Sequence, residues 1–323
     1  MTKLTRRAML GAAAAMTAAN ALSAPSARAA APMAGKQGAS FYRYKVGDFE
    51  VTVLNEGIAR NATPQNMAVN KTLPDVQKAL GDAFLPTDHV INQFNVVVVN
   101  TGKNLVLLDS GFGDSGPPTV GSLAANMAAA GIDPKNIDTV LVSHFHGDHI
   151  SGIRAKAGSA NFPNAEIMVP AGEWKFWTDA GEESKAQPPW KAGFANVKRV
   201  FDPVAKDMKQ YEHGKELVPG ITAIDARGHS PGHTAFLVTS GNGKLLVTSD
   251  TVNHQILIRN PDWALWADMD PAMAASARKR LLDMAAADKI QIAAYHLPFP
   301  STGFISKQGS GYEFHPAYWQ PVL

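Results

Sequence analysis

The chain has 323 residues, of which 45% are hydrophobic and none is cysteine. This composition fits a globular protein with ample core, and it excludes disulfide bonds, thiolate metal ligands and a cysteine nucleophile. The formal net charge of +2 comes without a cluster of Lys and Arg, which argues against nucleic acid as a partner.

The first 29 residues differ in composition from the rest of the chain. Arg6 and Arg7 precede an Ala-rich apolar stretch, and Ala27-Arg28-Ala29 supplies a small-x-small cleavage pattern. We expect residues 1–29 to be a twin-arginine-type signal peptide and residues 30–323 to form one folded domain of a periplasmic protein. The signal holds four cations and no acid, so its removal lowers the net charge from +2 to about −2. Its apolar stretch is too short and too Ala-rich to span a bilayer, so we expect no stable membrane insertion.

The remaining residues alternate between strand and helix patterns. The first half predicts strands over residues 41–53, 95–99, 105–108 and 139–142, and helices over residues 75–83 and 120–130. The second half predicts strands over residues 221–225, 234–239, 244–248 and 290–295, and a helix over residues 271–287. Residues 171–216 form the least regular segment, and the aromatic tail over residues 303–323 is expected to dock as an edge. The alternation indicates an α/β fold.

Residue types that bind metal are concentrated directly after the apolar run at residues 139–142. The stretch Ser143-His144-Phe145-His146-Gly147-Asp148-His149 places three imidazoles and one carboxylate within six residues. His144 and His146 are two apart, so an extended backbone can point both the same way, whereas Asp148 and His149 follow a glycine turn. One loop can therefore serve two metal ions through nitrogen and oxygen ligands.

The pattern H-x-H-x-D-H resembles the signature of the metallo-β-lactamase superfamily. Three further stretches resemble the rest of that family's ligand set and follow in the same order: Gly228-His229-Ser230-Pro231-Gly232-His233, Leu245-Leu246-Val247-Thr248-Ser249-Asp250 and Ile292-Ala293-Ala294-Tyr295-His296. The resemblance implies a four-layer αββα sandwich, and it implies that two Zn²⁺ ions, or other divalent metals, are bound per chain.

The resemblance also implies a role for each ligand residue. His144, His146 and His233 would hold one metal, Asp148, His149 and His296 the other, and Asp250 would bridge them. His229 receives a supporting place, because the Pro-Gly turn between it and His233 re-aims the chain. Asp109, in the strand ending Asp109-Ser110-Gly111, would brace the His loop without binding metal.

From Tyr42 onward the chain resembles a subgroup that contains methyl parathion hydrolase and lactonases. The stretches that carry this resemblance include Gly47-Asp48-Phe49-Glu50, Leu217-Val218-Pro219-Gly220-Ile221 and His296-Leu297-Pro298-Phe299-Pro300. The subgroup implies hydrolysis of small neutral esters, namely lactones or aryl esters and also organophosphate triesters. A hydroxide that bridges the metals would attack the carbonyl carbon, with Asp250 and Asp148 as catalytic residues. The candidate pocket residues are Phe112, Trp177, Phe194, Trp263 and Trp266, although Trp177 can equally be a core residue.

Other activities share the same ligand set. A β-lactamase would need a cation placed for the substrate carboxylate, and a glyoxalase-type thioesterase would need basic residues for its anionic thiol carrier. An oxidoreductase could hold iron in the same ligands. A non-catalytic binding protein would be expected to have lost ligands, and all seven are present. The expected partners are a small-molecule substrate and, as one possible assembly, a second copy of the chain in a homodimer.

Overall fold

The structure is a computed structural model, and it describes residue 31 and residues 33–323. The predicted signal peptide, residues 1–29, lies outside the described residues. The chain divides into a short unit, Met1–Gly38, and a large unit, Ala39–Leu323, to which every element below belongs. Within the described residues, no helix has the length and apolar character needed to cross a membrane.

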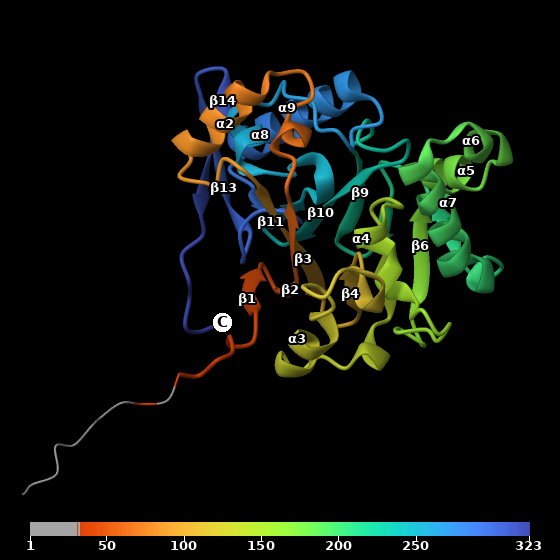
Figure 1. Cartoon of the computed structure of the whole chain (residues 1–323). Helices are drawn as coiled ribbons and strands as arrows, with labels where there is room; N and C mark the ends of the chain where they lie inside the picture. Colours follow the sequence, from red (N-terminus) through yellow and green to blue (C-terminus); the bar gives the residue numbers. More distant parts are fainter. Residues whose placement is uncertain (1–30, 32) are drawn as a thin grey trace, which may run out of the picture. The chain divides into compact units, whose positions relative to one another are not determined.

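Two mixed sheets form the centre of the large unit (Figure 1). The first sheet contains, in spatial order, β1 (Phe41–Val46), β2 (Phe49–Asn61), β3 (Val90–Asn100), β4 (Leu105–Leu108), β5 (Thr139–Leu141), β6 (Glu166–Pro170) and β7 (Lys209–Tyr211). The second contains, in spatial order, β14 (Gly311–Pro316), β13 (Thr302–Gln308), β12 (Gln291–Ala293), β11 (Gly243–Val247), β10 (Thr234–Ser240), β9 (Ile221–Asp225) and β8 (Glu216–Val218). The pairs from β4 to β7 and the pair β11–β12 are parallel, and the other pairs are antiparallel.

Helices cover the outer faces of both sheets. The helices are α2 (Leu73–Asp82), α3 (Leu123–Ala129), α4 (Gly147–Ile150), α5 (Ala171–Trp177), α6 (Ala180–Lys185), α7 (Pro188–Phe201), α8 (Gln255–Arg259) and α9 (Pro271–Ala287). Figure 1 shows α5, α6 and α7 together beside β6. Helix α9 lies against the other sheet, where Leu281 and Leu282 pack with residues of β11 and β12.

The alternation of side chains along each strand explains why four layers form. Val97 and Val99 of β3 point between the sheets and pack with residues of β9, β10 and β11. Val96 and Val98 point to the opposite face and pack with residues of α3, α5 and α7. Strands buried on both faces are runs of Val and Leu, which is the pattern seen in the sequence. The predicted αββα sandwich is confirmed.

The sequence predictions for individual elements are largely confirmed, with one correction. The strand pair at the start of the chain turns at Gly47-Asp48, and β14 forms the edge of its sheet, as expected for the tail. The prediction that residues 171–216 form the least regular segment is wrong, because α5, α6 and α7 occupy most of it. Helix α7 starts at Pro188, which suits the first turn of a helix, and it buries Phe194, Val197 and Phe201 on one face.

Candidate metal centre

The predicted ligand loops converge at the carboxyl ends of the parallel strands. His144 and His146 follow β5, and Asp148 and His149 lie in α4 directly after it. Asp250 follows β11 and His296 follows β12. The carboxyl ends of parallel strands are where α/β folds place ligands, because the chain leaves the sheet there in loops.

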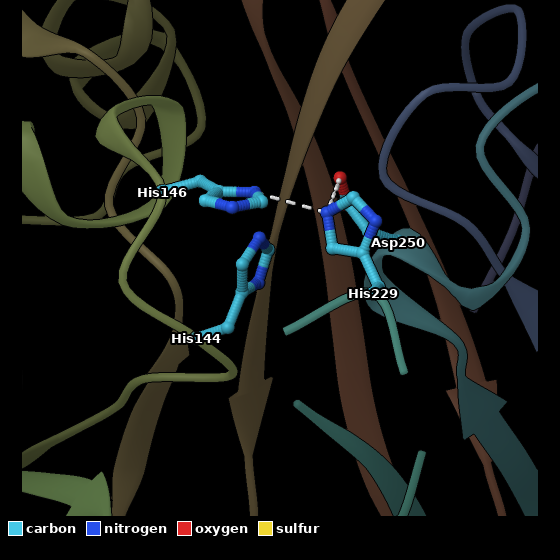
Figure 2. A group of neighbouring side chains, drawn as sticks. All are labelled: His144, His146, His229 and Asp250. Atoms are coloured by element: carbon cyan, nitrogen blue, oxygen red, sulfur yellow. Dashed lines mark hydrogen bonds and ion pairs between the residues drawn. The ribbon is translucent and has the colours of Figure 1, made fainter. Parts of the chain in front are cut away.

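The first cluster of ligand atoms joins both sheets (Figure 2). Nitrogen atoms of His144, His146 and His229 and an oxygen of Asp250 lie within 4.8 Å of one another. The Nε2 atom of His229 lies 2.9 Å from His146 Nδ1 and 3.2 Å from Asp250 Oδ2. Two imidazole nitrogens this close need a proton or a cation between them.

The structure exchanges the predicted roles of His229 and His233. The ring of His233 is tied down at both ends, since Nδ1 donates to Ala226 O at 2.9 Å and Nε2 accepts from Asp250 N at 3.1 Å. His229 instead has Nδ1 anchored on Asp268 Oδ1 at 3.0 Å, and this contact aims Nε2 into the cluster. The structure therefore places His229, and not His233 as expected, in the first cluster.

The second cluster contains the remaining predicted ligands. Ligand atoms of Asp148, His149, Asp250 and His296 lie within 4.8 Å of one another. The Nε2 atom of His149 lies 3.0 Å from Asp250 Oδ1 and 3.4 Å from Asp148 Oδ2. The Nε2 atom of His296 lies 3.1 Å from Asp250 Oδ2 and 3.4 Å from the same Asp148 oxygen. Asp250 belongs to both clusters, which is the position expected of a bridging carboxylate.

The electrostatics of both clusters fit divalent cations. Burial, together with neighbouring imidazoles, lowers the pKa of His144 and His146 well below the usual value and keeps both rings neutral. Burial opposes protonation of His149 as well, but the carboxylates around it hold its pKa well above the usual value. His144 Nε2 and His146 Nε2 are buried and have no hydrogen-bond partner. Neutral imidazole nitrogens without a partner, next to carboxylate oxygens, are the donor set that zinc prefers.

The comparisons with known proteins agree with this geometry. The profile of the Metallo-beta-lactamase superfamily matches residues 92–292. The chain belongs to the metallo-β-lactamase superfamily.

Its relatives in the superfamily include proteins named as lactonases. The chain is 31% identical over 143 residues to N-acyl homoserine lactonase AttM of Azorhizobium caulinodans, covering 40% of this chain and 48% of the relative. It is 33% identical over 137 residues to AttM of Agrobacterium fabrum, covering 39% of this chain and 46% of the relative. The chain thus spans about half the length of the curated relatives it matches.

Solved structures match over a larger part of the fold. AidC, described as a dizinc quorum-quenching lactonase with a bound product, is 26% identical with a TM-score of 0.82 over 87% of this chain and 98% of AidC. The hydrolase AbOPH is 30% identical with a TM-score of 0.83 over 88% of this chain and 100% of AbOPH.

Asp109 holds the loop that carries His144, His146 and His149 in place through hydrogen bonds. Its Oδ1 accepts from Ser143 N at 2.7 Å, and its Oδ2 accepts from Ser143 Oγ at 2.7 Å and lies 2.8 Å from His149 Nδ1. These contacts fix the plane of the His149 ring and leave its Nε2 for the second cluster. The backbone of Asp109 has φ +63°, which turns the chain sharply at the end of β4.

A cavity of about 530 Å³ borders both clusters. Five metal-cluster residues line it, namely His146, Asp148, His229, Asp250 and His296. Its aromatic lining consists of Phe94, Phe112, Phe145, Trp177, Trp190 and Trp266. One side of the cavity is thus formed by the candidate metal ligands, and the rest of its lining is largely apolar.

Three of the five predicted pocket residues line this cavity. Phe112, Trp177 and Trp266 do so, and Trp177 is also a core residue, because only 1% of its surface is exposed. Phe194 packs behind Trp177, with ring centroids 4.8 Å apart, because its position on α7 faces the core. Trp263 packs instead against the group of residues around α2 and α8.

Several residues that support the site were missed in the sequence. Asp268 orients His229, and Asn253 Nδ2 donates to Asp250 Oδ2 at 2.8 Å. Tyr295 donates its hydroxyl to Asp148 O at 2.6 Å, and its ring lies 4.0 Å from that of His149. Glu173, in the segment expected to be irregular, accepts four hydrogen bonds. Only Tyr295 carried a sequence signal, as the residue before the ligand His296.

Proposed function

We propose that this protein is a dinuclear zinc hydrolase of small neutral esters, with lactones as its main substrates. Aryl esters and organophosphate triesters are proposed as secondary substrates. The proposal is supported by the two ligand clusters that share Asp250, and by the lactonases among the chain's relatives.

The lining of the cavity is the observation that selects neutral substrates. No Lys or Arg is found among the described residues that border it. A β-lactam carboxylate or an anionic thiol carrier would therefore meet Asp148 and Asp250 without a fixed cation of the protein nearby. An uncharged ester pays no such penalty, and the aromatic walls bind its apolar parts.

The residues around the cavity have different roles in the proposed hydrolysis. Two bound divalent cations would supply hydroxide from water near neutral pH and polarise the carbonyl oxygen. Asp250 contributes negative charge to both clusters, and Asn253 fixes the orientation of its carboxylate. Asp148 joins His149 and His296 at the second cluster. Phe112, Trp190 and Trp266 reduce the water around the bound substrate, which strengthens every electrostatic interaction at the site.

A hydrolysis panel with zinc-loaded protein tests this function. The panel contains γ- and δ-lactones with short and long acyl chains, an aryl ester, a phosphotriester and a β-lactam. We expect kcat/KM to be highest for a lactone and β-lactam hydrolysis to be negligible, with all activities lost in chelator. A β-lactam preferred over every lactone, or a fully loaded protein that hydrolyses none of the esters, would refute the proposal.

The metal itself is tested separately, because iron in the same ligands would support oxidoreductase chemistry. Elemental analysis of protein isolated from its native compartment should give two zinc per chain and no visible iron absorption. One equivalent of metal under zinc-replete conditions would contradict the dinuclear proposal. The homodimer stays a prediction, which light scattering can test.

We also propose that the protein is exported to the periplasm by the twin-arginine route. The support is the order of features in residues 1–29: paired arginines, an apolar stretch and a small-x-small site. Replacing Arg6 and Arg7 with Lys should retain the full-length precursor in the cytoplasm. Normal processing in a strain that lacks the twin-arginine translocase would contradict this route.

A further inference from the structure

Glu173 is a fully buried carboxylate on α5 that accepts four hydrogen bonds. Its Oε2 accepts from Phe145 N and Trp177 Nε1, both at 2.9 Å. Its Oε1 accepts from Ser230 Oγ and Gly232 N, both at 2.6 Å. A protonated carboxyl would turn an O–H toward one of these donors, so the full set of four requires the ionised form. Burial raises the pKa of Glu173, and the four donors lower it by less than burial raises it.

The donors belong to the two loops that carry the ligands of the first metal cluster. Phe145 lies between His144 and His146, in the loop that follows β5 of the first sheet. Ser230 and Gly232 lie directly after His229, in the loop between β9 and β10 of the second sheet. One carboxylate therefore ties together loops that come from different sheets.

The start of α5 and the loop after His229 are in close backbone contact beside this carboxylate. A methyl group added to Gly232 would lie 2.4 Å from Glu173 N, and one added to Gly172 would lie 3.0 Å from Gly232 Cα. No side chain or water fits between the start of α5 and the His229 loop. The hydrogen bonds of Glu173 thus act across a fixed, dry contact, where a misplaced donor cannot be satisfied by solvent.

The ligands of the second cluster have other supports. His149 is held by Asp109, the backbone of Asp148 by Tyr295, and His296 Nδ1 donates to Gln93 O at 2.9 Å. None of these contacts passes through Glu173. Glu173 therefore holds the ligand loops of the first cluster and makes no hydrogen bond to His149, Asp148 or His296.

We propose that Glu173 is a positioning residue that selectively sets the geometry and affinity of the first metal site, formed by His144, His146 and His229. It acts through the backbone of both ligand loops and contacts neither metal nor substrate. This inference rests on the proposed dinuclear site.

Glu173→Gln provides the test, because Gln keeps the shape but accepts at only one of its two terminal atoms. Whichever way the amide is turned, the N–H of Phe145 or that of Gly232 then faces another donor. Chelator competition measures the affinity of each of the two metal-binding steps. We expect the affinity of one step to fall by about 10- to 100-fold. The other step should change by less than about twofold. With Co²⁺ as the probe, the visible bands of only one of the two bound ions should change.

Two further variants make the test decisive. Ser230→Ala removes one donor and leaves the carboxylate in place, so it should weaken the same step by a smaller factor, and it carries the test if Glu173→Gln does not fold. Glu166→Gln, on the strand that leads into α5, breaks only a surface pair with Lys209 at 2.6 Å and should leave both steps unchanged. Equal weakening of both steps, or none, in a folded variant would overturn the inference. A parent protein that binds one metal would instead refute the dinuclear proposal.

Discussion

His229 and His233 are four residues apart but have opposite surroundings. The Nε2 atom of His229 faces His146 and Asp250, whereas both ring nitrogens of His233 are used in hydrogen bonds within the fold. Burial also lowers the pKa of His233 to about 3, so this ring is neutral at physiological pH. The environment of each ring therefore favours His229 over His233 as a metal ligand.

The first prediction compares the alanine variants of these two residues. His229→Ala should lose one metal per chain and most of its activity, because the first cluster then has only three of its four donors and binds the ion weakly. His233→Ala should retain two metals but lose about 1–3 kcal/mol of stability, since the Asp250 N–H and the Ala226 carbonyl lose their partner. Metal analysis and urea unfolding of both variants give the answer. The reverse pattern would restore His233 as the ligand.

The sequence predicted which loops form the site but not which ring of Gly228–His233 faces it. The spacing H-x-H-x-D-H identifies a ligand loop, because neighbouring residues alone bring its side chains together. The choice between His229 and His233 depends on Asp268, which is far away in the sequence and reaches His229 only in the folded chain. No local pattern contains that information.

Glu56 gives a second prediction at the residue scale, on the pH dependence of stability. Burial raises its pKa from 4.5 to about 7, and its Oε2 has no hydrogen-bond partner. Between these two pH values the unfolded chain has released this proton while the folded chain still holds it. The contribution of Glu56 to stability therefore falls as pH rises from 4.5 to 7 and stays low above that pH.

Glu56→Gln should remove this penalty, because Gln stays neutral and can still accept from Gly113 N, as Glu56 Oε1 does at 3.0 Å. In metal-free protein, we expect the variant to gain on the order of 2 kcal/mol relative to the parent between pH 5 and pH 8. Urea unfolding at several pH values measures the difference. A constant difference across this range would show that Glu56 has an ordinary pKa.

At the scale of elements, a buried arginine connects α9 to the metal centre. Arg278 is 1% exposed and donates to the carbonyls of Thr251, Pro261 and Trp263 at 2.9–3.0 Å. Its Nη2 also lies 3.4 Å from Asp268 Oδ2, whose other oxygen holds His229. The helix thus fixes the loop at residues 251–268 and, through Asp268, the orientation of a metal ligand.

The third prediction is that Arg278→Met lowers the free energy of unfolding by about 3 kcal/mol, because buried carbonyls and a buried carboxylate lose a charged partner. Metal affinity should fall at the first cluster as well, since Asp268 is released. Arg280→Met, on the exposed side of the same helix, is the matched control and should change neither property by much. Equal effects of the two variants would contradict the proposed connection between α9 and the site.

Sequence patterns predicted most elements, and the main failure has a physical cause. Strands such as β4, Leu105–Leu108, were predicted to the residue because continuous Val and Leu runs are typical of strands buried on both faces. Residues 171–216 were expected to be irregular because Pro188-Pro189 and scattered tryptophans obscure the helical period. The proline in fact starts α7, and Glu173 of α5 was overlooked since no local signal marks a buried carboxylate.

At the scale of the whole large unit, the metal centre lies where the loops of the two sheets meet. His144, His146 and His149 follow a strand of the first sheet, whereas His229, Asp250 and His296 follow strands of the second. A bound metal pair would therefore connect the two halves of the sandwich. It would bind the folded chain and not the unfolded one, so its free energy of binding adds to the stability of the fold.

The fourth prediction is that removing metal destabilises the whole large unit and not only the active site. At zinc concentrations about 100 times the dissociation constant, each site contributes about 2.7 kcal/mol, and two sites together should raise the thermal midpoint by on the order of 10 °C. Scanning calorimetry with and without a chelator measures this shift, and added zinc should reverse it. His149→Ala should show about half of the shift, because the first cluster remains. A midpoint that does not respond to chelator in a protein loaded with two metals would mean that the metals do not connect the two sheets.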